Sequence, residues 1–172
     1  MTRYRPPQPK SSAYITPRGF EQLSEELRYL WKEKRPEVTQ QVSEAAALGD
    51  RSENADYIYG KRQLAEIDRR IRYLSKRIDE IQIVDWAPPD TTKVFFGALV
   101  RLRRNDSEDV RYCIVGPDEF DREDHFISCD SPLARALIGK RLGDEIELDL
   151  HGEVNHYEVA EIQYRRESAA PT

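Results

Sequence analysis

The sequence contains few of the residues from which self-contained catalytic and metal-binding sites are built. Its 172 residues include two cysteines, one methionine and three histidines. Cys113 and Cys129 do not have metal-ligand spacing, so we expect both to be reduced and structural. A Ser/His/Asp set and a phosphate-binding glycine-rich loop are also absent. Nothing in these residue types therefore predicts an independent enzyme.

Long apolar segments are absent as well. Hydrophobic residues make up 38% of the sequence and charged residues 34%. No apolar run approaches the length of a membrane span, and the N-terminal residues lack the apolar core of a secretory signal. We therefore expect a cytoplasmic protein that does not contact a membrane.

Charge is unevenly distributed along the chain. The formal net charge is −5, yet residues 1–15 contain three basic residues and no acidic one. Residues 16–85 contain 13 basic and 14 acidic residues, whereas residues 86–172 contain 11 basic and 18 acidic residues. The acidic C-terminal part argues against general nucleic-acid binding there and leaves room for a basic protein partner. Because residues 1–15 are rich in Pro, Ser and Arg, they are interpreted as a disordered tail.

Two long helical patterns occupy residues 16–85. Thr16 and Pro17 form a helix start, as N-cap and first helical residue, and Pro36 predicts a kink near Arg35. In the second pattern, apolar positions alternate at spacings of four and three, as in a coiled-coil seam. These positions are Gly60, Leu64, Ile67, Ile71, Leu74, Ile78 and Ile81. Two long helices joined by a short connection should fold back as an antiparallel hairpin.

The connection between the helices, with its tip at residues 49–53, is acidic. Asp50 and Glu53 lie three residues apart, and carboxylates are ligands that suit Mg²⁺. Two carboxylates do not complete a magnesium site, so a partner would have to supply further ligands. Alternatively, the four residues from Asp50 to Glu53 fit a capping box, in which Asp50 caps the second helix and Glu53 reaches back. The two interpretations do not exclude each other.

The outer surface of the second helix is basic. Between Lys61 and Arg77 there are seven basic residues and two acidic ones, and Arg62, Arg69 and Lys76 fall at the outermost heptad position. Charges at outer positions ordinarily keep a coiled coil soluble. A nucleic-acid backbone could also lie along such a strip. The pattern leaves both interpretations open.

After the second helix the periodicity of the apolar residues changes to two. The two prolines of residues 86–92 mark a linker, and residues 93–165 read as strands separated by turns. One short helix is expected near residues 132–138, and residues 166–172 are interpreted as a tail. The predicted fold class is therefore α+β, with an N-terminal antiparallel coiled-coil hairpin and a small, mostly antiparallel β domain.

Several segments resemble one known family. The tip run is Ala46-Ala47-Leu48-Gly49-Asp50-Arg51-Ser52-Glu53-Asn54-Ala55-Asp56-Tyr57. It closely resembles the hairpin-tip signature of the bacterial Gre transcript cleavage factors. Residues 66–74 and 94–97 are similar to the GreB branch of that family, and residues 130–137 resemble its C-terminal motif. The resemblance covers about residues 14–164.

The resemblance implies a fold and a mode of action that spacing does not show. It implies that the β domain is similar to FKBP-type prolyl isomerases, without their activity, and docks on RNA polymerase at the rim of the secondary channel. The coiled coil would enter the channel and bring its acidic tip to the active site. There the polymerase would hydrolyse the backtracked RNA 3′ end, so that arrested complexes resume elongation. We expect a monomer, because the hairpin must insert alone.

Site residues are carried over from the resemblance by position. Asp50 and Glu53 match the acidic tip residues and would help to hold a Mg²⁺ ion beside the polymerase's own aspartates, with no stable metal binding by the protein alone. Ser52 and Asn54 match neighbouring positions that could order water or RNA. The candidate basic contacts to RNA are Arg51, Lys61, Arg62 and Arg69. The candidate polymerase contacts are Asp130, Ser131 and Pro132.

Two other functions remain open on the sequence. A channel-binding regulator or inhibitor would occupy the same site without promoting cleavage, although the intact acidic pair argues against it. A prolyl isomerase is suggested by the resemblance of the C-terminal domain alone. The aromatic-lined pocket that such an enzyme needs is not evident from the four phenylalanines of the C-terminal half.

Overall fold

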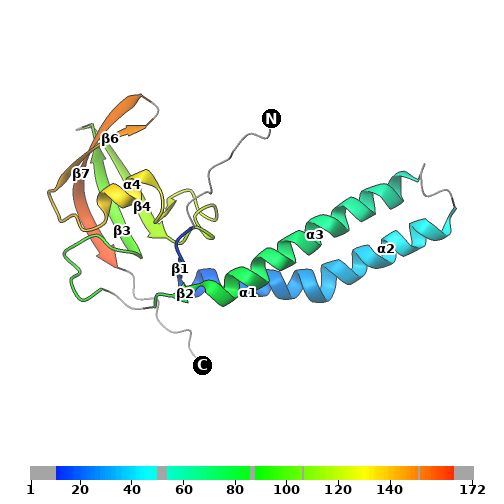
Figure 1. Ribbon diagram of the computed structural model, residues 1–172. Coiled ribbons are helices and arrows are strands. Elements are labelled where there is room, and N and C mark those ends of the chain that lie inside the picture. The colour runs from blue at the N-terminus through cyan, green and yellow to red at the C-terminus, as the bar shows by residue number, and fades with distance from the viewer. Residues whose placement is uncertain (1–10, 50–53, 86–87, 106, 151, 165–172) are drawn as a thin grey trace, which may run out of the picture. The chain divides into compact units, whose positions relative to one another are not determined.

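The computed structural model describes residues 11–49, 54–85, 88–105, 107–150 and 152–164. The chain divides into two compact units, a helical unit of residues 18–81 and a β unit of residues 1–17 and 82–172. The helical unit is a hairpin, and the β unit is a curled, mostly antiparallel sheet with one short helix (Figure 1). The predicted α+β fold class is therefore confirmed.

The first arm of the hairpin changes its helical geometry in the middle. It comprises α1 (Pro17–Tyr29), a π-helical segment η1 (Leu30–Lys34) and α2 (Arg35–Ala47). Proline has no backbone N–H and its ring crowds the carbonyl four residues earlier, so Pro36 disturbs the regular α pattern. The helix contains a wider, π-helical turn directly before Pro36, in which the Arg35 N–H donates to the carbonyl of Leu30, five residues earlier. The predicted helix start at Pro17 is confirmed, and next to Arg35, where a kink was predicted, the structure has the π-helical segment η1.

The second arm is the continuous helix α3 (Ala55–Glu80), which packs along α2 (Figure 1). Ile67 and Ile71 form a buried cluster with Val38 of α2. The partly buried side chains around this cluster are Leu27, Leu30, Val42 and Leu64. The heptad seam predicted for α3 is thus the surface that packs against the first arm.

The β unit contains a five-stranded sheet of order β5-β4-β3-β7-β6. Its elements are β3 (Ala98–Arg104), β4 (Glu108–Val115), β5 (Phe126–Ser128), α4 (Pro132–Leu137), β6 (Glu145–Leu150) and β7 (Glu153–Tyr164). Strand β5 pairs parallel with β4, and the other neighbours are antiparallel. Ala98, Val100 and Leu102 are fully buried in one core cluster with Leu133 and Leu137 of α4. The predicted short helix is confirmed, whereas the sequence patterns missed β5.

A second, two-stranded sheet involves the start of the chain. Strand β1 (Tyr14–Ile15) pairs parallel with β2 (Gln82–Ile83), and the Ile15 side chain is fully buried. The assignment of residues 12–15 to a disordered tail is therefore wrong. The composition of this segment is typical of a disordered tail, because Ser12, Tyr14 and Thr16 are polar or amphipathic residues. Their bonding partners lie about 70 to 118 positions away, so the local sequence does not show that the segment is ordered. Residues 1–10 lie outside the described ranges.

Two further predictions concerned membrane-spanning helices and the cysteines. None of the helices in the described part of the chain has the length and apolar character needed to cross a membrane. Cys129 belongs to the buried core of the β unit, and burial raises the pKa of its thiol. That is the environment of an unreactive, structural cysteine.

Candidate functional site

The acidic tip joins the end of α2 to the start of α3. Helix α2 ends at Ala47, and Gly49 has a φ of +112°, a backbone conformation that residues with a Cβ rarely adopt. Asp50, Arg51, Ser52 and Glu53 lie outside the described residues. The described residues of the first arm end at Gly49, and those of the second arm begin at Asn54. The four residues therefore belong to the connection between the two arms.

Asn54 secures the connection through both polar atoms of its side chain. Its Oδ1 accepts a hydrogen bond from the Tyr57 N–H at 3.1 Å, which makes Asn54 the N-cap of α3. Its Nδ2 donates to the Ala45 carbonyl of α2 at 2.8 Å. One side chain therefore caps the second helix and ties it to the last turn of the first.

The capping box predicted for Asp50 and Glu53 is wrong. Helix α3 starts at Ala55, and its N-cap is Asn54. The physical reason is the second hydrogen bond: an ionised aspartate has no donor for the Ala45 carbonyl, whereas an asparagine amide provides one. Capping of α3 therefore does not account for the acidic pair.

Close helix packing holds the two arms together next to the tip. A Cβ on Gly60 would lie 2.6 Å from Cγ2 of Val42, so the arms approach more closely here than any side chain on Gly60 permits. Farther from the tip, Arg35 Nε donates to Asp68 at 2.7 Å, and Arg70 makes a two-bond ion pair with Glu26 at 2.7 and 2.9 Å. These partly exposed pairs each stabilise the hairpin by at most about 1 kcal/mol.

The predicted RNA contacts on α3 are solvent-exposed. Lys61 places its ammonium 5.4 Å from the Tyr57 ring centroid, and the Arg62 side chain is 82% exposed. Arg69 is exposed and donates to the Ala65 carbonyl of its own helix. Arg77 differs from them, because it is buried and does not belong to the exposed basic surface. The described part of α3 thus presents its basic side chains to solvent near its start and middle.

The predicted polymerase contacts lie at the start of α4. The Ser131 hydroxyl accepts from the Ala134 N–H at 3.2 Å and caps the helix, and Pro132 is the exposed first helical residue. Asp130 accepts from the Ser12 hydroxyl at 2.5 Å and from the Ser12 N–H at 2.7 Å. These three residues therefore form a turn held by hydrogen bonds, which we call the docking turn after the role that the family resemblance implies for it.

The Asp130 carboxylate is the most strongly held group of the docking turn. Burial opposes its ionisation, but the hydrogen bonds from Ser12 and the guanidinium of Arg135, 3.5 Å away, outweigh burial and lower the pKa of Asp130. Its side chain remains 24% exposed. The docking turn therefore carries a negative charge that remains partly exposed to solvent.

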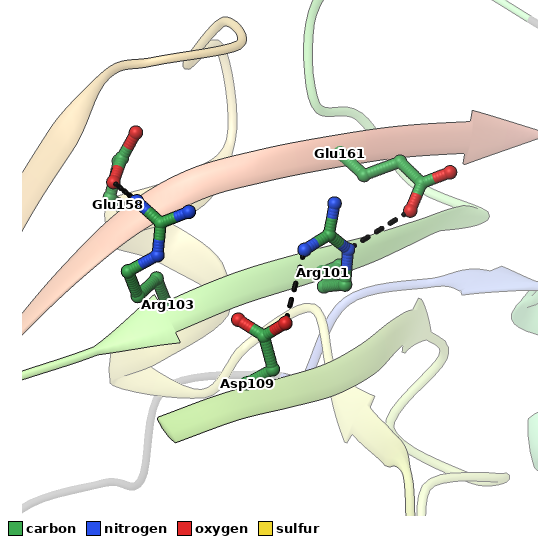
Figure 2. A network of polar contacts seen from close by, with 5 residues as sticks. All are labelled: Arg101, Arg103, Asp109, Glu158 and Glu161. Carbon is green, nitrogen blue, oxygen red and sulfur yellow. Dashed lines mark hydrogen bonds and ion pairs between the residues drawn. The ribbon is translucent and has the colours of Figure 1, made fainter. Parts of the chain in front are cut away.

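The outer face of the sheet carries a separate network of charges (Figure 2). Arg101 lies between Glu161 and Asp109, at 3.1 Å from each, and Arg103 pairs with Glu158 at 2.7 Å. The hydrogen bond to Glu161 is the largest cause that raises the pKa of Arg101. Each arginine of the network is paired with at least one carboxylate and the side chains remain partly exposed, which fits a solvated sheet face rather than a binding site.

Sequence patterns missed three residues next to the docking turn: Ser12, Thr16 and Glu119. Glu119 is 2% exposed and accepts from the Thr16 hydroxyl, the Thr16 N–H and the Gly116 N–H. A buried carboxylate with three donors has no signature in the sequence, because Thr16 lies 103 positions away. In the described residues, no group of three or more His, Cys, Asp or Glu side chains could hold a metal ion.

Comparison with known proteins identifies the family. The family described as "Transcription elongation factor, N-terminal" matches residues 13–83, and "Transcription elongation factor, GreA/GreB, C-term" matches residues 89–164. The chain belongs to the GreA/GreB family of transcription elongation factors.

Its similar relatives carry the name of one branch. "Transcription elongation factor GreB" of Haemophilus ducreyi is 64% identical over 80% of this chain and 85% of its own length. The protein of the same name from Pseudomonas aeruginosa is 52% identical over 95% of this chain and 98% of its own length. The resemblance to the GreB branch is thus confirmed. Among solved structures, the Gfh1 protein of Thermus thermophilus is 25% identical, covers 88% of this chain and 99% of its own, and has a TM-score of 0.41.

Proposed function

We propose that this elongation factor binds RNA polymerase, inserts its helical hairpin into the secondary channel and stimulates Mg²⁺-dependent hydrolysis of the backtracked RNA 3′ end. The observation that carries the proposal is the hairpin itself: two long arms whose connection holds the acidic pair Asp50 and Glu53. Family membership and the GreB relatives support the partner and the process. The protein would act in the cytoplasm as a monomer.

In this proposal the tip completes a metal site and does not form one alone. Asp50 and Glu53 offer only two carboxylates, too few for a stable Mg²⁺ site but suited to complete one begun by the polymerase. A second Mg²⁺ ion in the polymerase would activate water and stabilise charge on the phosphodiester. The chain's own contribution is to carry the two carboxylates on a hairpin. We further propose that it has no catalytic site of its own.

The flanking residues would serve this arrangement. Asn54 would fix the orientation of the tip, because it couples the start of α3 to Ala45. Lys61, Arg62 and the more distant Arg69 would attract the phosphates of the extruded RNA, together with Arg51 and Ser52 at the tip itself. The docking turn of Asp130, Ser131 and Pro132 would contact the rim of the channel.

The test uses a stalled, backtracked complex of the cognate RNA polymerase with 3′-labelled RNA and Mg²⁺. The wild-type protein should release short labelled 3′ fragments. Asp50→Asn with Glu53→Gln should slow release by about 100-fold, which corresponds to a loss of ~3 kcal/mol of transition-state stabilisation. The matched control is Glu44→Gln with Asp56→Asn, which removes the same charge from two exposed positions on either side of the tip. The control should cleave at the wild-type rate.

Two outcomes would contradict the proposal. Equal release by the wild type and the tip variant would remove Asp50 and Glu53 from the chemistry. No release by either protein, combined with competition for the channel, would point to a regulator that does not stimulate cleavage.

A further inference from the structure

The first described residues of the chain form a strap across the β unit. We define the strap as residues 12–16. It is held at its start by Asp130, in its middle by the pairing of β1 with β2, and at its end by Glu119. The family resemblance assigned no role to residues before about position 14, so the strap's first anchor is a feature of the structure alone.

The first anchor is a two-point contact on one carboxylate. The Ser12 N–H donates to Oδ2 of Asp130 at 2.7 Å, and the Ser12 hydroxyl donates to Oδ1 at 2.5 Å. Two hydrogen bonds on different oxygens fix the rotation of the carboxylate as well as its position. An ionised carboxylate has about four acceptor sites, so it can still accept a hydrogen bond from a partner.

The rest of the strap is also held by contacts within the β unit, so the position of Ser12 does not depend on its bonds to Asp130 alone. Thr16 donates twice to the buried Glu119, with its hydroxyl at 2.6 Å and its N–H at 3.0 Å. A Cβ on Gly116 would lie 2.3 Å from the Tyr14 carbonyl oxygen, so only glycine permits this approach. The path of the strap between its two carboxylate anchors is therefore determined by contacts within the β unit.

We propose that Ser12 is a positioning residue for polymerase binding: it holds the Asp130 carboxylate in the orientation in which the docking turn accepts a basic group of the polymerase. The inference rests on the proposed function, because it assumes that the docking turn contacts the polymerase. A carboxylate that is already oriented loses little side-chain freedom on binding, which favours affinity. Ser12 does not touch the partner in this scheme and acts through Asp130.

The test measures binding of the fluorescently labelled full-length protein to RNA polymerase, alongside the cleavage assay. Ser12→Ala keeps the backbone donor but loses the hydroxyl, and we expect it to raise the Kd about fivefold. Ser12→Thr retains the hydroxyl and should bind within about twofold of the wild type. Ser11→Ala, a change at the exposed neighbouring position, is the matched control and should leave the Kd unchanged. At saturating protein, the maximal cleavage rate of Ser12→Ala should equal that of the wild type.

A double-mutant comparison shows whether Ser12 acts through Asp130. Asp130→Ala should weaken binding, and adding Ser12→Ala to it should cause no further loss. A second readout is the titration of Asp130 followed by NMR of its side-chain carboxyl, which reports directly whether the Ser12 hydroxyl bonds the ionised carboxylate. In Ser12→Ala the pKa of Asp130 should rise toward its ordinary value, because a hydrogen bond to the ionised form is lost.

Several results would overturn the inference. Wild-type affinity in Ser12→Ala would remove the positioning role while the proposed function stood. An equal loss in the Asp130→Ala background would mean that Ser12 acts by another route, and so would an unchanged Asp130 pKa. If the wild-type protein itself did not bind RNA polymerase, the proposed function would be wrong and this inference with it.

Discussion

Asn54 is the residue that caps α3 and ties its start to the end of α2. The sequence singled out the right segment, because the acidic signature is continuous along the chain. One of the two interpretations left open placed the cap at Asp50 and was wrong, since Asp50, Ser52 and Asn54 all belong to types that cap helices. The structure identifies Asn54 as the cap through its bonds to the Tyr57 N–H and to the carbonyl of Ala45, nine positions earlier.

We expect Asn54→Ala to destabilise the hairpin by about 2 kcal/mol, because it removes the helix cap and the bond to Ala45. Asn54→Asp keeps an acceptor for the Tyr57 N–H but has no donor for the carbonyl, so its loss should be about half as large. Urea unfolding followed by far-UV circular dichroism measures both. If the two variants were equally stable, the bond to Ala45 would have no part in the stability of the hairpin.

At the scale of elements, the hairpin combines features that the sequence predicted with one that it did not. Pro36 predicted a kink near Arg35, and the π-helical segment η1 lies directly before it, because a proline acts locally on its own helix. The spacing of Ile67, Ile71 and Leu74 predicted the packed face of α3. Neither pattern shows that Gly60 lies against Val42, since the register between two helices is set by their packing and not by either sequence alone.

Gly60→Ala should destabilise the hairpin by about 1 to 3 kcal/mol, the usual cost of overpacking. At an exposed helix position, a glycine-to-alanine change would stabilise the protein by about 1 kcal/mol. Destabilisation by Gly60→Ala would therefore show that α3 approaches Val42 too closely for a Cβ. The new methyl group would meet Cγ2 of Val42, a stiff β-branched side chain. Val42→Ala added to Gly60→Ala should restore part of the loss.

Urea unfolding of Gly60→Ala, Val42→Ala and the double variant provides the measurement. The matched control is Ala65→Gly, which makes the reverse change at an exposed position of α3. A stabilising effect of Gly60→Ala would show that the two arms separate easily at this point.

At the scale of the whole chain, the strap joins residues more than 100 positions apart. Glu119 is the centre of this connection, with the Gly116 N–H and two donors of Thr16 on one buried carboxylate. Burial of a charge is unfavourable unless hydrogen bonds compensate, and here three donors do so. The strap therefore makes residues 12–16 part of the β unit.

Glu119→Ala should destabilise the β unit by about 3 kcal/mol, because it leaves buried donors without an acceptor. Glu119→Gln retains one carbonyl oxygen and should cost about 1 kcal/mol. Hydrogen exchange of the Thr16 and Gly116 amides measures the effect locally, and both amides should exchange faster in the alanine variant. Asp121→Asn, at an exposed position nearby, is the control and should exchange like the wild type. Unchanged exchange in Glu119→Ala would show that β1 and β2 hold the strap without Glu119.

The sequence by itself determined the class of fold, the hairpin, the place of its acidic connection and the family. Each of these depends on patterns that are local or periodic along the chain: heptad spacing, alternation in strands, proline positions and a continuous signature. Tertiary structure alone decided the partners of Asn54, Gly60, Asp130 and Glu119. The distant partners among these are brought together by chain folding over 9 to 118 positions, and a contact between distant residues leaves no periodic trace in the sequence.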